Sequence, residues 1–190
     1  MEADWAAEIG PHLPSIDVPW EGFIDMRENL SAISTIAEAA LHPALSSALC
    51  AWNAEDSLLF TSKCDRWTIE NETIDPDEFA APTDEAQIAV ASYIDILQRD
   101  PIRLVSFNFH ENWAKQLTIA LHDLPITHGR IDLVLRPATV APHLGFGMTL
   151  YAAGCGADAL AAEAAWQAVL AAAIPDTISS ASKAILSAGE

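Results

Sequence analysis

Basic side chains are scarce in this sequence. Its 190 residues contain nine Lys plus Arg against 27 Asp plus Glu, which gives a formal net charge of −18. A surface this negative repels the phosphates of nucleic acids and of anionic lipid headgroups. Residues 1–38 hold eight acids and one base, and residues 70–85 hold seven acids and no base. We therefore predict that neither nucleic acid nor membrane is a partner, and we expect a negatively charged surface loop over Glu70–Glu85.

Cysteines and long apolar runs are also few. The three cysteines, at positions 50, 64 and 155, are an odd number and too scattered for a disulfide framework, which favours a reducing compartment. Residues 1–5 carry acids where an export signal carries basic residues. The most apolar stretch, residues 157–174, is interrupted by Asp158 and Glu163, whereas a membrane span needs about 20 apolar residues. We predict a soluble, cytoplasmic protein.

Sequence motifs of known enzyme and cofactor sites are absent. There is no G-x-x-x-x-G-K-[ST], no H-E-x-x-H and no G-x-S-x-G. Residues 154–159 match G-x-G-x-x-A, but no strand follows them, as a dinucleotide-binding fold requires. His122 and His128 stand six positions apart, which is not the spacing of a helical ligand pair. We therefore expect no cofactor and no metal site.

What the sequence has is a large apolar share, 51% of its residues, which is enough for one well-packed domain over residues 1–190. The segment around Trp5 is predicted to be helical, and the prolines that follow it favour an extended chain, so that residues 1–22 form an arm. Apolar residues at helical spacing predict helices over residues 29–40 and 44–52. The first quarter of the chain is therefore expected to be helical.

The rest of the chain alternates strand and helix patterns. Strands are predicted over 57–69, 88–97, 131–135 and 146–150, and helices over 108–124 and 157–173, with a helical tail over 175–190 after Pro175. Strand-strand-helix thus occurs twice. We predict an α+β fold with a mainly antiparallel four-stranded sheet, helices packed on one face, and a helical segment before it.

Polar residues occupy the alternate positions of the predicted strands, on the face opposite the apolar one. A sheet covered by helices on one face only would gather them on one surface that carries charges of both signs. Such a surface can bind a small polar ligand or a protein partner, although a solvated sheet face shows the same pattern. The candidate binding residues are Lys63, Asp65, Tyr93, Asp95, Asp132, Arg136 and Tyr151, with Thr149 among them.

Cys155 is the candidate for a catalytic residue. It precedes a predicted helix, and a helix N-terminus lowers the pKa of a thiol. A nucleophilic cysteine needs a histidine base, and the candidates are His12, His42, His110, His122, His128 and His143. A cysteine between two glycines in a turn is also a common small buried residue, so both interpretations stay open.

Three functions remain from these observations. The first is a non-catalytic binding or protein-interaction module that also forms a homodimer, with the polar sheet face or the N-terminal arm as its contact surface. The second is a small enzyme with Cys155 as its nucleophile. The third is an acidic mimic that neutralises a basic protein, because the chain carries three carboxylates for each basic residue.

Overall fold

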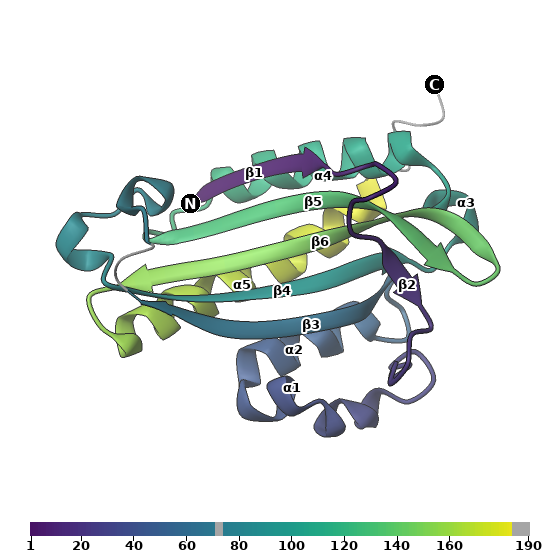
Figure 1. Ribbon diagram of the computed structural model, residues 1–190, viewed down its shortest axis with the longest axis horizontal. Helices are drawn as coiled ribbons and strands as arrows, with labels where there is room; N and C mark the ends of the chain where they lie inside the picture. Colours follow the sequence, from purple (N-terminus) through teal and green to yellow (C-terminus); the bar gives the residue numbers. More distant parts are fainter. Residues whose placement is uncertain (71–73, 184–190) are drawn as a thin grey trace.

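The computed structural model describes residues 1–70 and 74–183 of the chain, as a sheet with helices behind it (Figure 1). The strands are β1 (Glu2–Ala7), β2 (Ile16–Val18), β3 (Leu59–Glu70), β4 (Ile88–Gln98), β5 (Gly129–Val140) and β6 (His143–Gly156). The α-helices are α1 (Ala37–Leu41), α2 (Pro43–Asn53), α3 (Pro101–Leu104), α4 (Phe107–His122) and α5 (Ala159–Lys183). Short 3-10 helices are η1 (Leu30–Thr35), η3 (Pro76–Phe79) and η4 (Thr83–Glu85).

The sheet has six strands in the order β1-β5-β6-β4-β3, with β2 paired to β5 beyond the end of β1. Strands β3, β4, β6 and β5 form antiparallel pairs, whereas β1 and β2 both run parallel to β5. The prediction of a mainly antiparallel four-stranded sheet is therefore wrong. The four predicted strands are all present, but the N-terminal segment adds two parallel strands and makes the sheet mixed.

The predicted helix around Trp5 is also wrong, because Glu2–Ala7 is strand β1. Met1, Ala3 and Trp5 pack against the main hydrophobic core, and Asp4 between them is exposed. This is the period-two alternation of a half-buried strand. The alternation is too short to recognise without its partner, and long-range pairing with β5 decides the conformation.

Helices α2, α4 and α5 pack on one face of the sheet and bury the main core there (Figure 1). Two tryptophans at its centre satisfy their ring N–H groups: Trp166 Nε1 donates to Ser92 Oγ at 2.9 Å, and Trp113 Nε1 donates to Ser180 Oγ at 3.0 Å. The helix expected over 157–173 and the described part of the tail expected over 175–190 form the single helix α5. Residues 184–190 of that expected tail lie outside the described part.

The glycines of the G-x-G-x-x-A segment are explained by this packing. Gly154 and Gly156 lie at the end of β6, directly under α5. A Cβ atom at Gly154 would lie 2.2 Å from the backbone nitrogen of Trp166, and one at Gly156 would lie 2.5 Å from that of Ala162. The glycines therefore allow the helix backbone to approach the strand.

Candidate functional site

We call the face of the sheet opposite the helices the open face, and the described residues cover it mainly at its two ends. At one end β2 and α3 bury a small cluster that includes Ile16, Phe60 and Leu104. At the other end the segment with η3 and η4 buries Phe79 against Ala89 and Cys155. The middle of the open face carries the polar residues that the sequence placed there.

One row of side chains crosses the middle of the open face. The strand register sets Asp65 on β3 beside Tyr93 on β4, Tyr93 beside Tyr151 on β6, and Tyr151 beside Asp132 on β5. The two tyrosine rings lie 6.1 Å apart, centroid to centroid, and Trp67 lies 6.3 Å from Tyr93. Rings at this separation attract one another, so three strands share one aromatic surface.

The row has the symmetric order Asp, Tyr, Tyr, Asp across β3, β4, β6 and β5, and the topology of the sheet explains this symmetry. The strand pairs β3-β4 and β5-β6 meet at the antiparallel pair β4 and β6, so a two-fold rotation between β4 and β6 exchanges the two strand pairs. That rotation exchanges Tyr93 with Tyr151, and Asp65 with Asp132. An Asp–Tyr pair thus recurs at the same place in each strand-strand-helix unit.

A buried network of polar groups lies beside this row. The Thr149 hydroxyl donates to Oδ1 of Asp95 at 2.7 Å and accepts from Nη1 of Arg136 at 3.1 Å. Nη2 of Arg136 also donates to Glu8 at 2.9 Å and to the Tyr151 hydroxyl at 3.2 Å. Burial raises the pKa of Asp95, while Thr149 and Arg136 oppose that rise. Through the bond from Arg136 to its hydroxyl, the network fixes the position of the Tyr151 side chain.

Replacing Thr149 by valine should therefore destabilise the protein. Asp95 is only 6% exposed and would lose the hydroxyl that donates to it. A buried acceptor left without its donor costs about 1–3 kcal/mol. Chemical unfolding measures the loss; Thr118→Val, which removes a hydroxyl bonded only to the carbonyl of Ala114 in α4, should cost less. Equal losses in the two variants would contradict this account of the network.

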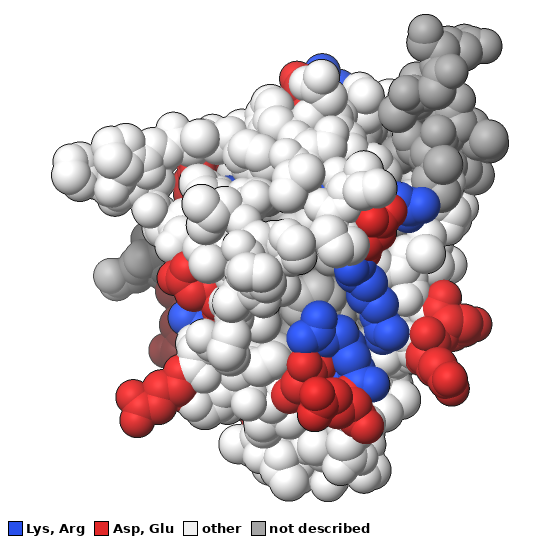
Figure 2. Space-filling view, turned by 90° about the vertical axis from the view of Figure 1, so that its right-hand side faces the viewer, with Lys and Arg blue, Asp and Glu red and all other residues white. Residues whose placement is uncertain are grey.

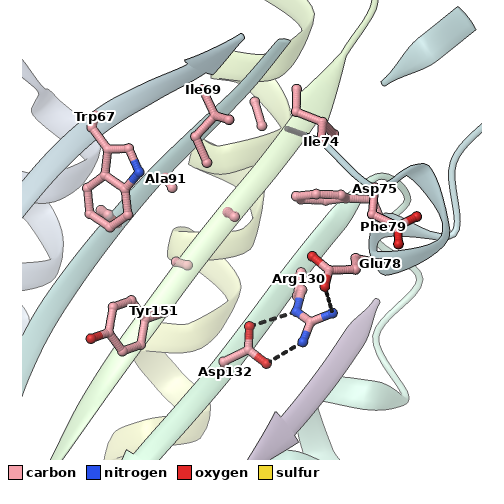
Figure 3. Close-up of a pocket in the computed structure, with 14 residues that line it drawn as sticks. Trp67, Ile69, Ile74, Asp75, Glu78, Phe79, Ala91, Arg130, Asp132 and Tyr151 are labelled. Atoms are coloured by element: carbon pink, nitrogen blue, oxygen red, sulfur yellow. Dashed lines mark hydrogen bonds and ion pairs between the residues drawn. The ribbon is translucent and has the colours of Figure 1, made fainter. Parts of the chain in front are cut away.

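A hollow of about 350 Å³ lies on the other side of the row (Figure 3). Its floor is made of the small residues Ala89, Ala91 and Ala153. Trp67 and Tyr151 stand over β4 and β6 on one side of it, and Phe79 stands at the end near η3. Ala89 and Ala91 on β4 and Ala153 on β6 leave room that larger side chains would fill.

The remaining wall of the hollow is charged. Arg130 on β5 donates from Nε and Nη2 to the two carboxylate oxygens of Asp132, at 2.7 and 2.8 Å. Glu78 of η3 approaches Arg130 at 3.9 Å, and Asp75 lies beside it on the rim (Figure 3). The bond from Arg130 to Asp132 is the main cause that raises the pKa of Arg130, and the charges of Glu78 and Asp4 add to it.

The structure brings most of the candidate binding residues together. Asp65, Tyr93, Tyr151 and Asp132 share the row, and Asp95, Thr149 and Arg136 share the network beside it. Lys63 lies next to the irregularity in β3 between Thr61 and Cys64, with its Nζ 5.3 Å from the centroid of the Trp20 ring. Lys63 therefore sits at the margin of this group, against the N-terminal arm.

Sequence reasoning missed the residues that make the hollow. Trp67 and Arg130 each stand two positions from a candidate aspartate, so the period-two rule could have placed them on the same face. Phe79 and Glu78 come from a connection with no periodic pattern, and only the folded chain brings them to the sheet. Of the expected acidic loop Glu70–Glu85, residues 71–73 lie outside the described part.

Cys155 is buried, with only 1% of its surface exposed. Burial raises the pKa of its thiol to about 11, and the charge of Glu85 adds to that rise. A nucleophilic cysteine needs the opposite shift. The backbone amide of Cys155 donates to the backbone carbonyl of His128. The imidazole ring of His128 contacts Glu85.

Residues 1–70 and 74–183 contain no group of three or more His, Cys, Asp or Glu side chains that could hold a metal ion. Across those same residues, none of the helices combines the length and the apolar character needed to cross a membrane. Comparison of this chain with models of protein families, with curated proteins and with solved structures gave no match. The open face is therefore the feature of this chain that points to a function.

Proposed function

We propose that the protein is a non-catalytic binding module and that the middle of its open face is the binding surface. One observation carries this proposal: strands β3 to β6 and the segment with η3 form a hollow beside the Asp–Tyr–Tyr–Asp row, and the described residues leave it open to solvent. Aromatic rings next to charged groups on a concave surface are typical of ligand sites.

The surface is prepared for binding before a ligand arrives. Tyr151 is held by Arg136, and Arg130 is held by both oxygens of Asp132. Little side-chain freedom remains to be lost, and this lowers the entropic cost of binding. Tyrosine and tryptophan also provide much contact area for few rotatable bonds.

A binding module fits these residues better than an enzyme with Cys155. The thiol is buried beneath Phe79 and Ala89, its pKa is raised, and it belongs to a hydrophobic cluster. On the open face, in contrast, Arg130 pairs with Asp132 and Arg136 pairs with Glu8. These ion pairs hold side chains of the surface in position.

Backbone amide shifts in nuclear magnetic resonance spectra test the proposal. The probes are three sets of short Gly-Ser peptides of equal length that carry lysine, glutamate or phenylalanine. We expect at least one set to shift the amides around Ala91, Tyr93, Tyr151 and Ala153. If none of the sets shifts these amides, or if shifts concentrate on α4 and α5, the proposal is wrong.

A further inference from the structure

We propose that the partner is a basic segment of another protein, and that the hollow receives one of its lysine or arginine side chains. This inference rests on the proposed function and states which ligand the open face takes. It follows from the walls of the hollow, from the balance of charge around it, and from the positions of the other basic residues.

The apolar part of the hollow suits the stem of a long cationic side chain. The alanine floor offers methyl groups, and the rings of Trp67, Tyr151 and Phe79 stand around it. Methylene groups of lysine or arginine pack on such surfaces while the charged end stays near water. A cation close to the face of an aromatic ring is also attracted by the ring's electrons.

The charged part of the hollow favours a ligand of positive charge. Among the described residues, Arg130 is the only basic one that lines it, and both oxygens of Asp132 are bonded to that guanidinium. Asp75 and Glu78 then leave the wall with a surplus of negative charge. Glu78 keeps more than half of its side chain exposed, so its carboxylate remains available to an incoming cation.

The acidic surface extends past the hollow, and this favours a protein segment over a small molecule. On the β1 side, Glu2 and Asp4 form a shallow depression with Arg130. On the η3 side, Asp77 and Glu85 belong to the same segment as Asp75 and Glu78 and are also exposed, with Glu85 beside His128. A small amine would touch only the hollow, whereas an extended basic chain would meet carboxylates on both sides of it.

Besides Arg130, the open face carries Lys63 at its margin and Arg136, which pairs with Glu8; most other basic residues of the described part lie away from it. Figure 2 shows basic side chains gathered at the end of the molecule that carries α3, with carboxylates beside them. At that end Arg27 pairs with Asp25 and Arg103 with Asp100, while Arg99 donates to backbone carbonyls of Leu59, Asn53 and Ala54. The open face is left with far fewer bases than acids.

Calorimetric titration of the full chain tests the inference with the lysine and glutamate peptides, with a Gly-Ser peptide of equal length that carries arginine, and with free arginine methyl ester. We expect the two cationic peptides to bind and to lose most of their affinity between about 50 and 300 mM salt, because exposed charges are screened. Trp67→Ala should weaken binding roughly tenfold, as expected for loss of a cation–aromatic contact. The double variant Asp75→Asn/Glu78→Gln should weaken it by a similar factor.

The matched control is Glu111→Gln/Asp123→Asn, which removes the same charge from the helix side of the molecule, where Glu111 on α4 pairs with Lys115 and Asp123 follows the helix. It should bind the lysine peptide nearly as well as the unchanged protein. Equal weakening by both double variants would mean general attraction to an acidic protein and would overturn the inference. Tighter binding of the ester than of the peptides would overturn the choice of a protein segment. Binding of the glutamate peptide to the open face would overturn the cationic ligand and leave the proposed function standing.

Discussion

Gly154→Ala should destabilise the protein by about 3 kcal/mol or more, because it forces a methyl group into a closely packed backbone contact. The new Cβ would lie 2.2 Å from the nitrogen of Trp166 and 2.6 Å from the carbonyl carbon of Ala165. Neither atom belongs to a flexible side chain, so the whole of α5 has to move away from β6. That movement also disturbs the bond from Trp166 to Ser92 in the core.

Thermal unfolding measures this effect, and a loss of about 3 kcal/mol lowers the Tm by roughly 6–12 °C in a chain of this size. Gly10→Ala is the matched control, because its Cβ would meet only the Leu13 side chain at 3.4 Å. The control should stay within about 0.5 kcal/mol of the unchanged protein. A Gly154→Ala variant as stable as this control would show that helix and strand do not approach as closely as described.

Acidification from about pH 7 to pH 5 should lower the free energy of unfolding by about 2 kcal/mol through His110 alone, because protonation is linked to folding. His110 is fully buried on α4 between Phe109, Trp113 and Phe146. Its Nδ1 donates to the carbonyl of Ser106 at 2.9 Å, and its Nε2 has no partner among the described residues. Burial lowers the pKa of His110 to about 4.

The sign follows from the direction of that shift. The unfolded chain takes up this proton near pH 6.5, but the folded protein does so only near pH 4. Stability is therefore complete above about pH 6.5 and falls as the pH drops toward 4. Burial also lowers the pKa of His42, so the contribution of His110 has to be isolated by substitution.

His110→Phe keeps an aromatic ring at this position and removes the proton. Urea unfolding of both proteins at several pH values separates the effect of His110 from that of other groups. The free energy of unfolding of the variant should change less between pH 7 and pH 5, by about 2 kcal/mol. Parallel pH profiles for the two proteins would mean that His110 is not buried as a neutral ring.

The four antiparallel strands β3, β4, β5 and β6 could be predicted from the sequence because their patterns are local. Ile131, Leu133 and Leu135 alternate with polar residues, and β5 includes all three of them. Strand β1 could not be predicted in this way. Its alternation covers only a few residues, and what fixes it is pairing with β5, more than a hundred positions away.

The candidate binding residues were predictable for the same reason, and the hollow was not. Period two places Tyr93 and Tyr151 on the open face, but it does not set them side by side. Their pairing depends on the register between β4 and β6. The hollow further depends on Ala91 and Ala153, which are neighbours across β4 and β6. It also depends on Phe79 of η3, which packs there from the connection between β3 and β4.

Amide shift mapping with the lysine and glutamate peptides is the measurement that tests the central claim most directly, because it locates binding without relying on any substitution. The account expects the lysine peptide to shift amides on β4 and β6 around Ala91, Tyr93, Tyr151 and Ala153, with the helical layer unchanged. Saturable shifts confined to α4 and α5, or none with either peptide, would contradict the claim that the open face is the binding surface.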